Sequence, residues 1–460
     1  MEITAEYERR LDAPEGFELP DLGGEPLESR VFTSVYYDTA DSSLARSGIT
    51  LRRRLEHGGS LWQLRLPVAG ARLELAQPGG PVEAPAELAS LLVAHVRRGP
   101  ITRIAELRTR RRGALVARKG TTAEITVDEV AVMDALRVAD QFVEVEIELR
   151  EGNPKRLADI AGELAEAGAR PSDGLPKLFR ALGLESVRRP ASKRPFEALV
   201  ALLGVQLREI LAHDPGARLG EDPESVHEMR VAVRRTRALL HAGAVLVADD
   251  TDGLREELQW LGQALGDVRD LDVLVEHLGE RADLLEAGDR VVARKLLRSL
   301  ERQRTAARKT LLKVLASDRY FSLLDRYEEV LAELQPSGSD VTLGSIVRKE
   351  AKKLRAAAAA LPADPPDPEL HALRKRGKRL RYAAELAGQN GVVRRAKRFQ
   401  DVLGAHQDAV TAEERLRALA DNAPTEQALV AGRLVEGERA RRAEARRRWR
   451  QELEELLRAV

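Results

Sequence analysis

The chain has 460 residues, which is enough for more than one domain with a sizeable core. Its 75 Lys and Arg residues balance 74 Asp and Glu residues, so no overall basicity indicates nucleic-acid binding, and local charge clusters become the informative feature. The absence of cysteine excludes disulfides, a thiolate nucleophile and Cys-ligated metal. Because neither an apolar signal core nor a bilayer-spanning apolar run is present, we expect a soluble cytoplasmic protein with no membrane partner. The abundance of Arg and Ala suggests a bacterial coding sequence rich in GC.

Up to about residue 150, polar and apolar side chains alternate with period two, a pattern typical of β-strands. Turns rich in Gly or Pro at 57–59 and 78–80 separate several of these segments. Helical patterns near 86–97 and 154–167 interrupt or close the region. These features predict a β-rich N-terminal domain. Its strand-like segments are 5–11, 48–55, 60–67, 71–76, 105–112, 114–119, 123–128 and 141–149.

One face of almost every predicted strand is ionic. Because side chains alternate along a strand, each set of charged residues lies on a single face of its strand. The solvated face of a half-exposed sheet would show the same pattern without any further function. However, the charged residues of some sets are all acidic, and those of others are all arginine. A surface that is only solvated usually carries both positive and negative side chains, because neighbouring side chains of like charge repel each other. The sets are Glu6, Glu8 and Arg10; Thr50, Arg52 and Arg54; Gln63 and Arg65; Arg72 and Glu74; Arg108 and Arg110; Glu124, Thr126 and Asp128; and Glu144, Glu146 and Glu148.

If the sheet closes into a barrel, its ionic face would line the interior. Carboxylates there could hold a divalent metal such as Mg²⁺, which binds a few carboxylates together with phosphate oxygens. Arginines could clamp phosphates, since the guanidinium group makes paired contacts with them. The alternation therefore raises the hypothesis of a phosphate site that needs metal.

A segment rich in Arg and Pro, 188–195, is predicted to link two domains at 1–187 and 196–460. Beyond it, long amphipathic segments rich in Ala, Leu, Arg and Glu are broken near 214–216, 335–338 and 362–368. This pattern predicts an all-helical domain. Together with the β-rich domain, it gives an α+β multidomain chain.

The predicted helical domain contains one basic pattern twice, at a constant offset of 144 (371 − 227). Each copy occupies about a quarter-turn of a helix beside an apolar stripe. Because like charges at these spacings destabilise a helix, the repetition favours a polyanion ligand, although a solvated Arg-rich surface is the alternative. The first copy is His227, Arg230, Arg234 and Arg237, and the second is His371, Arg374, Lys378 and Arg381.

A second motif is also duplicated. Leu265-Gly266 with Arg269-Asp270 has its counterpart in Leu403-Gly404 with Gln407-Asp408, at an offset of 138 (403 − 265). We therefore predict two homologous helical bundles related by pseudo-twofold symmetry. This symmetry would bring both basic faces to a shared groove or pore, where low-dielectric walls focus the field.

Glu6-x-Glu8-x-Arg10 resembles the N-terminal Glu-x-Glu-x-Lys signature of the CYTH superfamily, the triphosphate tunnel metalloenzymes. Further segments match motifs of this family and occur in the same order along the chain, over roughly residues 1–185. It implies an eight-stranded antiparallel tunnel that binds triphosphates. Arg10 and Arg65 depart from the family's lysines, and Pro176 stands where serine is common. The supporting segments are 36–39, 48–54, 62–65, 108–110, Asp128, 144–149 and 177–182.

On this resemblance and the ionic alternation, we expect a divalent ion, Mg²⁺ or Mn²⁺, to be held by carboxylates while arginines hold the phosphates. The expected metal ligands are Glu6, Glu8, Glu144 and Glu146. The expected catalytic residues are Glu148, Arg10 and Lys177. The expected substrate-binding residues are Arg52, Arg54, Arg65, Arg72, Arg108 and Arg110.

The duplicated segments 227–235 and 371–375 resemble the conserved-histidine α-helical domain, CHAD, over roughly residues 195–460. This resemblance implies binding of inorganic polyphosphate, and with it association with polyphosphate granules. Gln407 departs from the pattern, since the first half has Arg269 there. The residues expected to bind polyphosphate are His227, Arg230, Arg234, Arg237, His371, Arg374, Lys375, Lys378, Arg381 and Tyr382.

The leading hypothesis is therefore a metal-dependent hydrolase of tripolyphosphate or polyphosphate ends that also binds polyphosphate. A polyphosphate-binding protein without turnover is the alternative. A CYTH-type adenylyl cyclase ranks below both, because no residues identify an adenine pocket. Nucleic-acid binding is disfavoured by the near-neutral charge and by an aromatic content of 3%, which leaves few side chains for base stacking.

Overall fold

The computed structural model describes residues 2–68, 71–97, 99–172, 177–182, 194–421 and 423–460. The chain divides into two compact units. One comprises Met1–Arg188 with Leu211–Glu221, and the other comprises Arg189–Ile210 with Asp222–Val460. Most of the predicted linker, 188–195, lies outside the described residues, so that boundary remains a prediction.

The first unit is built on an antiparallel sheet of ten strands in the order β1-β6-β5-β4-β3-β7-β8-β9-β2-β10. This order is open, so the expected tunnel of eight strands is corrected to ten strands that are not closed by pairing. The strands are β1 (Glu2–Glu6), β2 (Glu8–Ala13), β3 (Glu25–Asp38), β4 (Thr50–Glu56), β5 (Gly59–Val68), β6 (Ala71–Pro78), β7 (Thr102–Arg118), β8 (Thr121–Asp134), β9 (Arg137–Glu151) and β10 (Arg170–Pro171).

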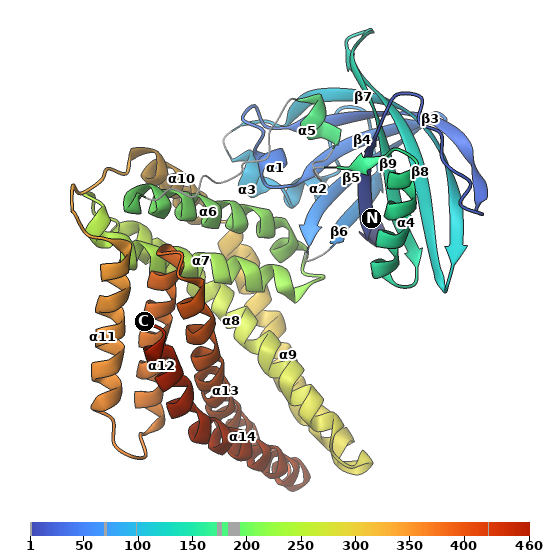
Figure 1. Ribbon diagram of the computed structural model, residues 1–460. Helices are drawn as coiled ribbons and strands as arrows, with labels where there is room; N and C mark the ends of the chain where they lie inside the picture. Colours follow the sequence, from blue (N-terminus) through green and yellow to red (C-terminus); the bar gives the residue numbers. More distant parts are fainter. Residues whose placement is uncertain (1, 69–70, 98, 173–176, 183–193, 422) are drawn as a thin grey trace. The chain divides into compact units, whose positions relative to one another are not determined.

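The sheet is strongly curved (Figure 1). Its N-terminal segment belongs to both ends of the ladder, because β1 pairs with β6 whereas β2 pairs with β9. Only Tyr7 separates β1 from β2, and its carbonyl accepts a hydrogen bond from the Leu149 amide at 2.9 Å. The segment 2–13 therefore contributes a strand at each end of the ladder.

The outer face carries an apolar core beneath helix α4 (Leu157–Glu166). Val145 and Ile147 of β9 are fully buried there with Leu164 of α4. Because successive strand residues point to opposite faces, this packing directs Glu144 and Glu146 to the inner face. The remaining helical segments of this unit are α1 (Ser43–Arg46), α2 (Ala86–Ser90), α3 (Val93–Val96), η1 (Pro154–Arg156) and α5 (Lys177–Ala181).

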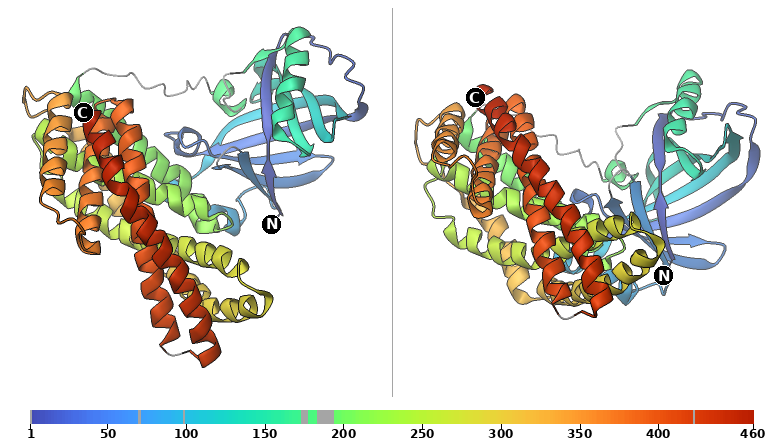
Figure 2. Two further views of the ribbon diagram at one scale, coloured as in Figure 1. Left: turned by 60° about the horizontal axis from the view of Figure 1, so that its bottom comes forward. Right: turned by 90° about the horizontal axis from the view of Figure 1, so that it is seen from below.

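The second unit is helical, and α7 packs against α8, α12 against α13, and α7 against α12. The hairpins α8–α9 and α13–α14 are long and antiparallel (Figures 1 and 2). Within the described ranges, no helix combines enough length with enough apolar character to cross a membrane. Helix α6 (Pro195–Leu219) is divided between the units, because its residues from Leu211 on belong to the first. The other helices are α7 (Pro223–Gly243), η2 (Ala244–Leu246), α8 (Asp252–Asp283), α9 (Ala287–Leu315), α10 (Asp318–Glu333), α11 (Leu343–Ala359), α12 (Asp367–Leu386), α13 (Asn390–Ala420) and α14 (Thr425–Arg458).

The predicted helix break near 214–216 is wrong, because α6 continues through Pro215. Proline has no N–H, so the carbonyl of Leu211 lacks its usual helical donor. That carbonyl instead accepts a hydrogen bond from His95 Nε2 at 3.0 Å, within the first unit. The predicted breaks at 335–338 and 362–368 are confirmed.

His95 should make the first unit sensitive to acid. Burial lowers the pKa of His95 to about 4, so the folded protein resists protonation below the ordinary histidine pKa. As pH falls from about 6.5 to 4, only the unfolded chain takes up this proton, and stability decreases by about 3 kcal/mol. Urea unfolding over this pH range should show the loss in the wild type but not in His95→Gln, whose amide can still donate to Leu211.

Candidate functional site

The inner face of the curved sheet gathers charged side chains from most of its strands. Cross-strand register places Arg10 opposite Glu146, and Arg111 opposite Asp128. Arg72 of β6 also donates to Glu8 of β2 at 2.7 Å, although these strands are not neighbours in the ladder. The curvature therefore brings residues from separate parts of the sheet into one ionic cluster.

Lys177 at the start of α5 lies at the centre of the acidic side of this cluster. Its Nζ contacts Asp128 and lies 3.2 Å from Glu146 Oε1. Burial alone would lower the pKa of Lys177, but the neighbouring carboxylates outweigh it and raise the pKa. Burial likewise opposes ionisation of Glu146, yet Lys177 and Arg111 hold its pKa well below the usual range. Both groups are therefore charged at neutral pH.

Glu144 differs from the other inner carboxylates. Its side chain is fully buried, and neither carboxylate oxygen has a hydrogen-bond partner within the described residues. The nearest cation is Arg10, whose Nε lies 3.5 Å from Oε1. Burial raises the pKa of Glu144 to about 7. Buried acceptors are normally satisfied, so these two oxygens point to a cation that completes the site.

The donor set fits a divalent ion. Glu8, Glu144 and Glu146 supply carboxylate oxygens, which are the ligands that Mg²⁺ and Mn²⁺ favour. Glu8 and Glu146 are held by arginines in this structure, at 2.5 Å from Arg10 and 2.7 Å from Arg111 respectively. The side chain of the fourth expected ligand, Glu6, lies outside the described residues, and its backbone pairs with Arg72.

The opposite part of the cluster is rich in arginine. Arg65 Nε donates to Glu74 at 2.6 Å, and Arg52 Nε donates to Gln63 at 2.9 Å. Arg54 stacks 3.8 Å above the ring of Phe32. Burial, followed by repulsion from Arg52, lowers the pKa of Arg54 to about 10. These contacts hold the guanidinium groups in place, and guanidinium is a group well suited to contact phosphate oxygens.

Glu148 lies toward one end of the inner face. It is opposite Glu8 in the ladder and accepts a hydrogen bond from Arg150 at 2.8 Å. Burial raises the pKa of Glu148. A carboxylate with a raised pKa is better suited to accept a proton than one held firmly ionised.

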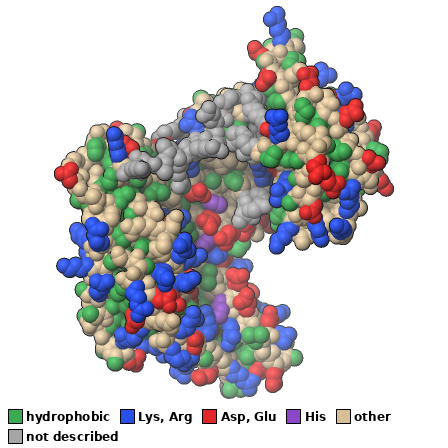
Figure 3. Space-filling view, viewed as in Figure 1, with side chains coloured by type: hydrophobic (Ala, Val, Ile, Leu, Met, Phe, Trp, Pro, Cys, Tyr) green, Lys and Arg blue, Asp and Glu red, His purple; other side chains and the backbone are tan. Residues whose placement is uncertain are grey.

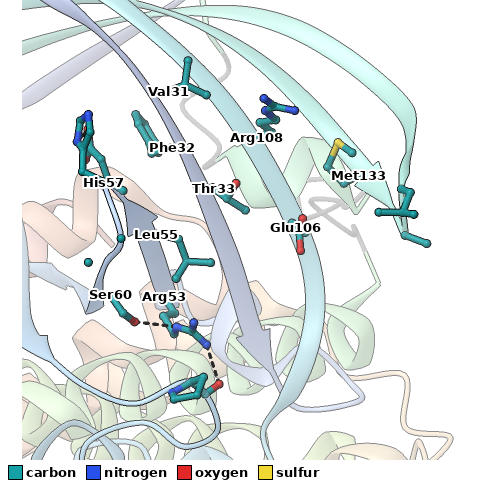
Figure 4. Close-up of a pocket in the computed structure, with 16 residues that line it drawn as sticks. Val31, Phe32, Thr33, Arg53, Leu55, His57, Ser60, Glu106, Arg108 and Met133 are labelled. Atoms are coloured by element: carbon teal, nitrogen blue, oxygen red, sulfur yellow. Dashed lines mark hydrogen bonds and ion pairs between the residues drawn. The ribbon is translucent and has the colours of Figure 1, made fainter.

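The structure does not bring Arg108 and Arg110 into this cluster. Both are exposed, whereas Arg111 contacts Asp128 at 2.6 Å on the inner face. Residues 108, 110, 111 and 112 are all arginine, so the sequence pattern could not show which face of β7 points inward. Arg111, together with Glu74 described above, belongs to this cluster, although neither residue was among the site residues expected from the sequence. Figure 4 shows Arg108 with Val31, Thr33, Glu106 and Met133 around a pocket of about 690 Å³.

The helical unit holds a second charged region, in which α7 and α12 meet. Arg234 Nε donates to Tyr382 Oη at 3.1 Å, joining the two helices. Lys378 faces repulsion from Arg374 and Arg234, and burial together with this repulsion lowers the pKa of Lys378 to about 7. The two basic patterns therefore do approach each other. Figure 3 shows Lys and Arg side chains of the unit interspersed with Asp and Glu on the face in view.

Other expected residues of the helical unit differ in their surroundings. Arg237 donates to Gln259 at 2.8 Å, and Arg381 lies 3.3 Å from Glu385. Lys375 is exposed. Burial is the largest contribution that lowers the pKa of His227 and of His371.

One cluster on α7 has the geometry of metal ligands within the described part of the chain. The ligand atoms of Glu224, His227 and Glu228 lie within 4.8 Å of one another. Arg269 is 3.7 Å from Glu224, so a cation already partly compensates this cluster.

Comparison with known proteins agrees with this two-part organisation. Residues 4–174 match the CYTH domain, and residues 201–417 match the CHAD domain. The uncharacterized protein Rv2226 of Mycobacterium tuberculosis strain H37Rv is 32% identical over 505 residues, covering 99% of this chain and 96% of that protein.

Two solved structures resemble part of the chain. PptA from Streptomyces chartreusis is 24% identical, with a TM-score of 0.48 over 56% of this chain and 99% of its own. The CHAD domain from the plant Ricinus communis is 27% identical, with a TM-score of 0.49 over 59% of this chain and 95% of its own. From the domain matches and the mycobacterial relative, the chain belongs to the family of proteins that join a CYTH domain to a CHAD domain.

Proposed function

We propose that the CYTH unit hydrolyses inorganic triphosphate or the ends of polyphosphate with a divalent ion, and that the CHAD unit binds polyphosphate. The observation that carries the first part is the presence, on one face of the sheet, of several arginines and of Glu144, a buried carboxylate whose oxygens lack hydrogen-bond partners among the described residues. CYTH membership supports the metal requirement.

In this proposal, the arginines of the inner face exchange carboxylate partners for phosphate oxygens. Arg52, Arg65 and Arg111 would hold successive phosphates, and Arg10 with Lys177 would balance charge near the cleaved bond. A bound Mg²⁺ or Mn²⁺ ion would neutralise phosphate charge and orient the attacking water. Glu6, Glu8, Glu144 and Glu146 are its proposed ligands. Glu148 would accept the proton from the water.

Binding without turnover is the second candidate function. Arg10 and Arg65 stand where the family pattern has lysine, and each differs from lysine in geometry and in proton affinity. Phosphate release from tripolyphosphate, long-chain polyphosphate and ATP, measured with Mg²⁺ or Mn²⁺ and after EDTA treatment, separates these functions. Release that survives EDTA unchanged would exclude the metal-dependent mechanism.

Glu144→Gln tests the proposed metal ligand with little change of shape. Loss of the negative charge should lower tripolyphosphate hydrolysis by at least about 100-fold, because the ion loses a ligand. Glu106→Gln, on the outer wall of the Arg108 pocket, is the matched control and should retain near-normal rates. Comparable rates in Glu144→Gln and the wild type would contradict the assignment.

Arg111 and Arg108 provide a second matched pair on one strand. Arg111→Ala should raise the KM for tripolyphosphate about tenfold or more, since it removes an inner-face cation that contacts Asp128 and Glu146. Arg108→Ala should leave KM within about twofold, because Arg108 lies on the exposed face. The opposite ranking in steady-state kinetics would show that the phosphate chain binds outside the inner face.

For the CHAD unit, we propose two homologous helical halves related by pseudo-twofold symmetry around the α7–α12 contact. Each half would contribute one basic face to a single polyphosphate groove. Support comes from the Arg234–Tyr382 hydrogen bond and from the mutual repulsion of Arg374, Lys378 and Arg234. Such repulsion between cations is relieved when a polyanion binds.

Lys378 should make polyphosphate binding depend on pH. Because its pKa is lowered to about 7, Lys378 is charged below this pH and becomes neutral above it. Affinity for long-chain polyphosphate should therefore fall as pH rises from about 6.5 to 8.5. Its charged neighbours Arg374, Arg381, Arg234 and Arg230 stay protonated in this range. Calorimetric titration should show a flatter pH profile for Lys378→Arg; an unchanged profile would contradict this role.

A further inference from the structure

The guanidinium group of Arg230 rests on the backbone of helix α8. A Cβ atom placed on the buried Gly266 would lie 3.5 Å from Nη2 and 3.6 Å from Nε of Arg230. One helical turn later, Asp270 accepts a hydrogen bond from Arg230 Nη1 at 2.7 Å. Residues four apart share a helix face, so the glycine and the aspartate contact one guanidinium together.

The proximity of a glycine and an arginine recurs in the second half of the helical unit. A Cβ atom on the buried Gly404 would lie 3.4 Å from Nη2 and 3.8 Å from Nε of Arg374. Asp408 attracts the Arg374 guanidinium, but no hydrogen bond or ion pair joins these two described side chains, and Arg374 Nε has no hydrogen-bond partner among the described residues. Gly404 and Asp408 follow Gly266 and Asp270 at one offset, 138 (404 − 266 and 408 − 270).

These two glycines differ from other buried helical glycines in what they contact. A Cβ on Gly377 would meet the ring of Phe399 at 2.6 Å, and one on Gly243 would meet Leu199 at 2.4 Å. Those positions require glycine for apolar packing. At Gly266 and Gly404 the neighbour is a guanidinium group, although glycine destabilises a helix interior. The lack of a larger side chain at these positions leaves the space that the guanidinium groups occupy.

We propose that Gly266 and Asp270 together position Arg230 as a phosphate-binding arginine, and that Gly404 leaves the corresponding room for Arg374. The glycine leaves room for the guanidinium to lie against the helix, and the aspartate fixes its rotation. The remaining N–H groups then face the ligand with little loss of side-chain freedom on binding. This inference rests on the proposed polyphosphate binding by the CHAD unit.

Substitutions at Gly266 test the glycine in the full-length protein, with long-chain polyphosphate as the probe. Gly266→Ala is the control, because its Cβ would make ordinary contact with Arg230, and its Kd should stay within about twofold. Gly266→Leu would occupy the guanidinium's place and should weaken binding about tenfold. The slope of log Kd against log salt concentration should also decrease by about one, as expected for one lost phosphate contact.

A double-mutant cycle separates positioning from general damage. In an Arg230→Ala background, Gly266→Leu should cause no further loss of affinity, because its effect acts through Arg230. An additional loss in that background would overturn the proposal. If Arg230→Ala itself left polyphosphate binding unchanged, the proposed function of this face would fail instead.

Asp270→Asn gives a test that does not depend on packing. Removing a carboxylate beside a polyanion site should strengthen binding if the aspartate only repels phosphate. If Asp270 positions Arg230, binding should weaken by about threefold or more despite the lost negative charge. Asp267→Asn is the matched control on α8, since Asp267 contacts Gln263 at 2.7 Å and not an arginine. Stronger binding in both variants would overturn the proposal.

Discussion

Burial of charge on the inner face of the CYTH sheet constrains the structure around it. Ions removed from water must be paired or hydrogen-bonded, because desolvation otherwise outweighs any contact they make. Arg111 meets this requirement by contacting both Asp128 and Glu146, and Lys177 from α5 completes the same group. The apolar outer face under α4 supplies the packing that such an ionic face cannot.

The CHAD unit handles charge in the opposite way. Its two basic faces bring Lys378 close to Arg374 and Arg234, and burial together with the resulting repulsion lowers the pKa of Lys378. The unit tolerates this repulsion because most cations there are only partly buried, while apolar residues such as Leu373 and Leu380 pack behind them. Such a surface gains free energy when a polyanion replaces water and small counterions.

Alternation in the sequence identified much of the inner face but not all of it. The faces of Glu144, Glu146 and Arg65 were predictable because the predicted strands 141–149 and 60–67 offered charges at one parity only. Strand β7 has arginines at both parities, so the choice of Arg108 over Arg111 could not be made without the register against β8.

The fold shows the same limit of sequence reasoning. Strand β3 was missed, since the Gly-Glu-Pro start of its region resembles a loop. The break at Pro215 was expected from local chemistry, whereas the structure satisfies the freed carbonyl of Leu211 with His95. These two residues are 116 positions apart in the chain, so periodicity and turn composition contain no trace of the contact.

The two charge arrangements suit ligands of different kinds. On the inner face of the sheet, described cations such as Arg52 and Lys177 are nearly matched by carboxylates such as Glu74 and Glu146. A triphosphate entering this nearly neutral space must bring positive charge with it, which is the electrostatic reason to expect a divalent ion there. The α7–α12 face has an excess of positive charge, so the proposed binding of polyphosphate there would need no accompanying metal.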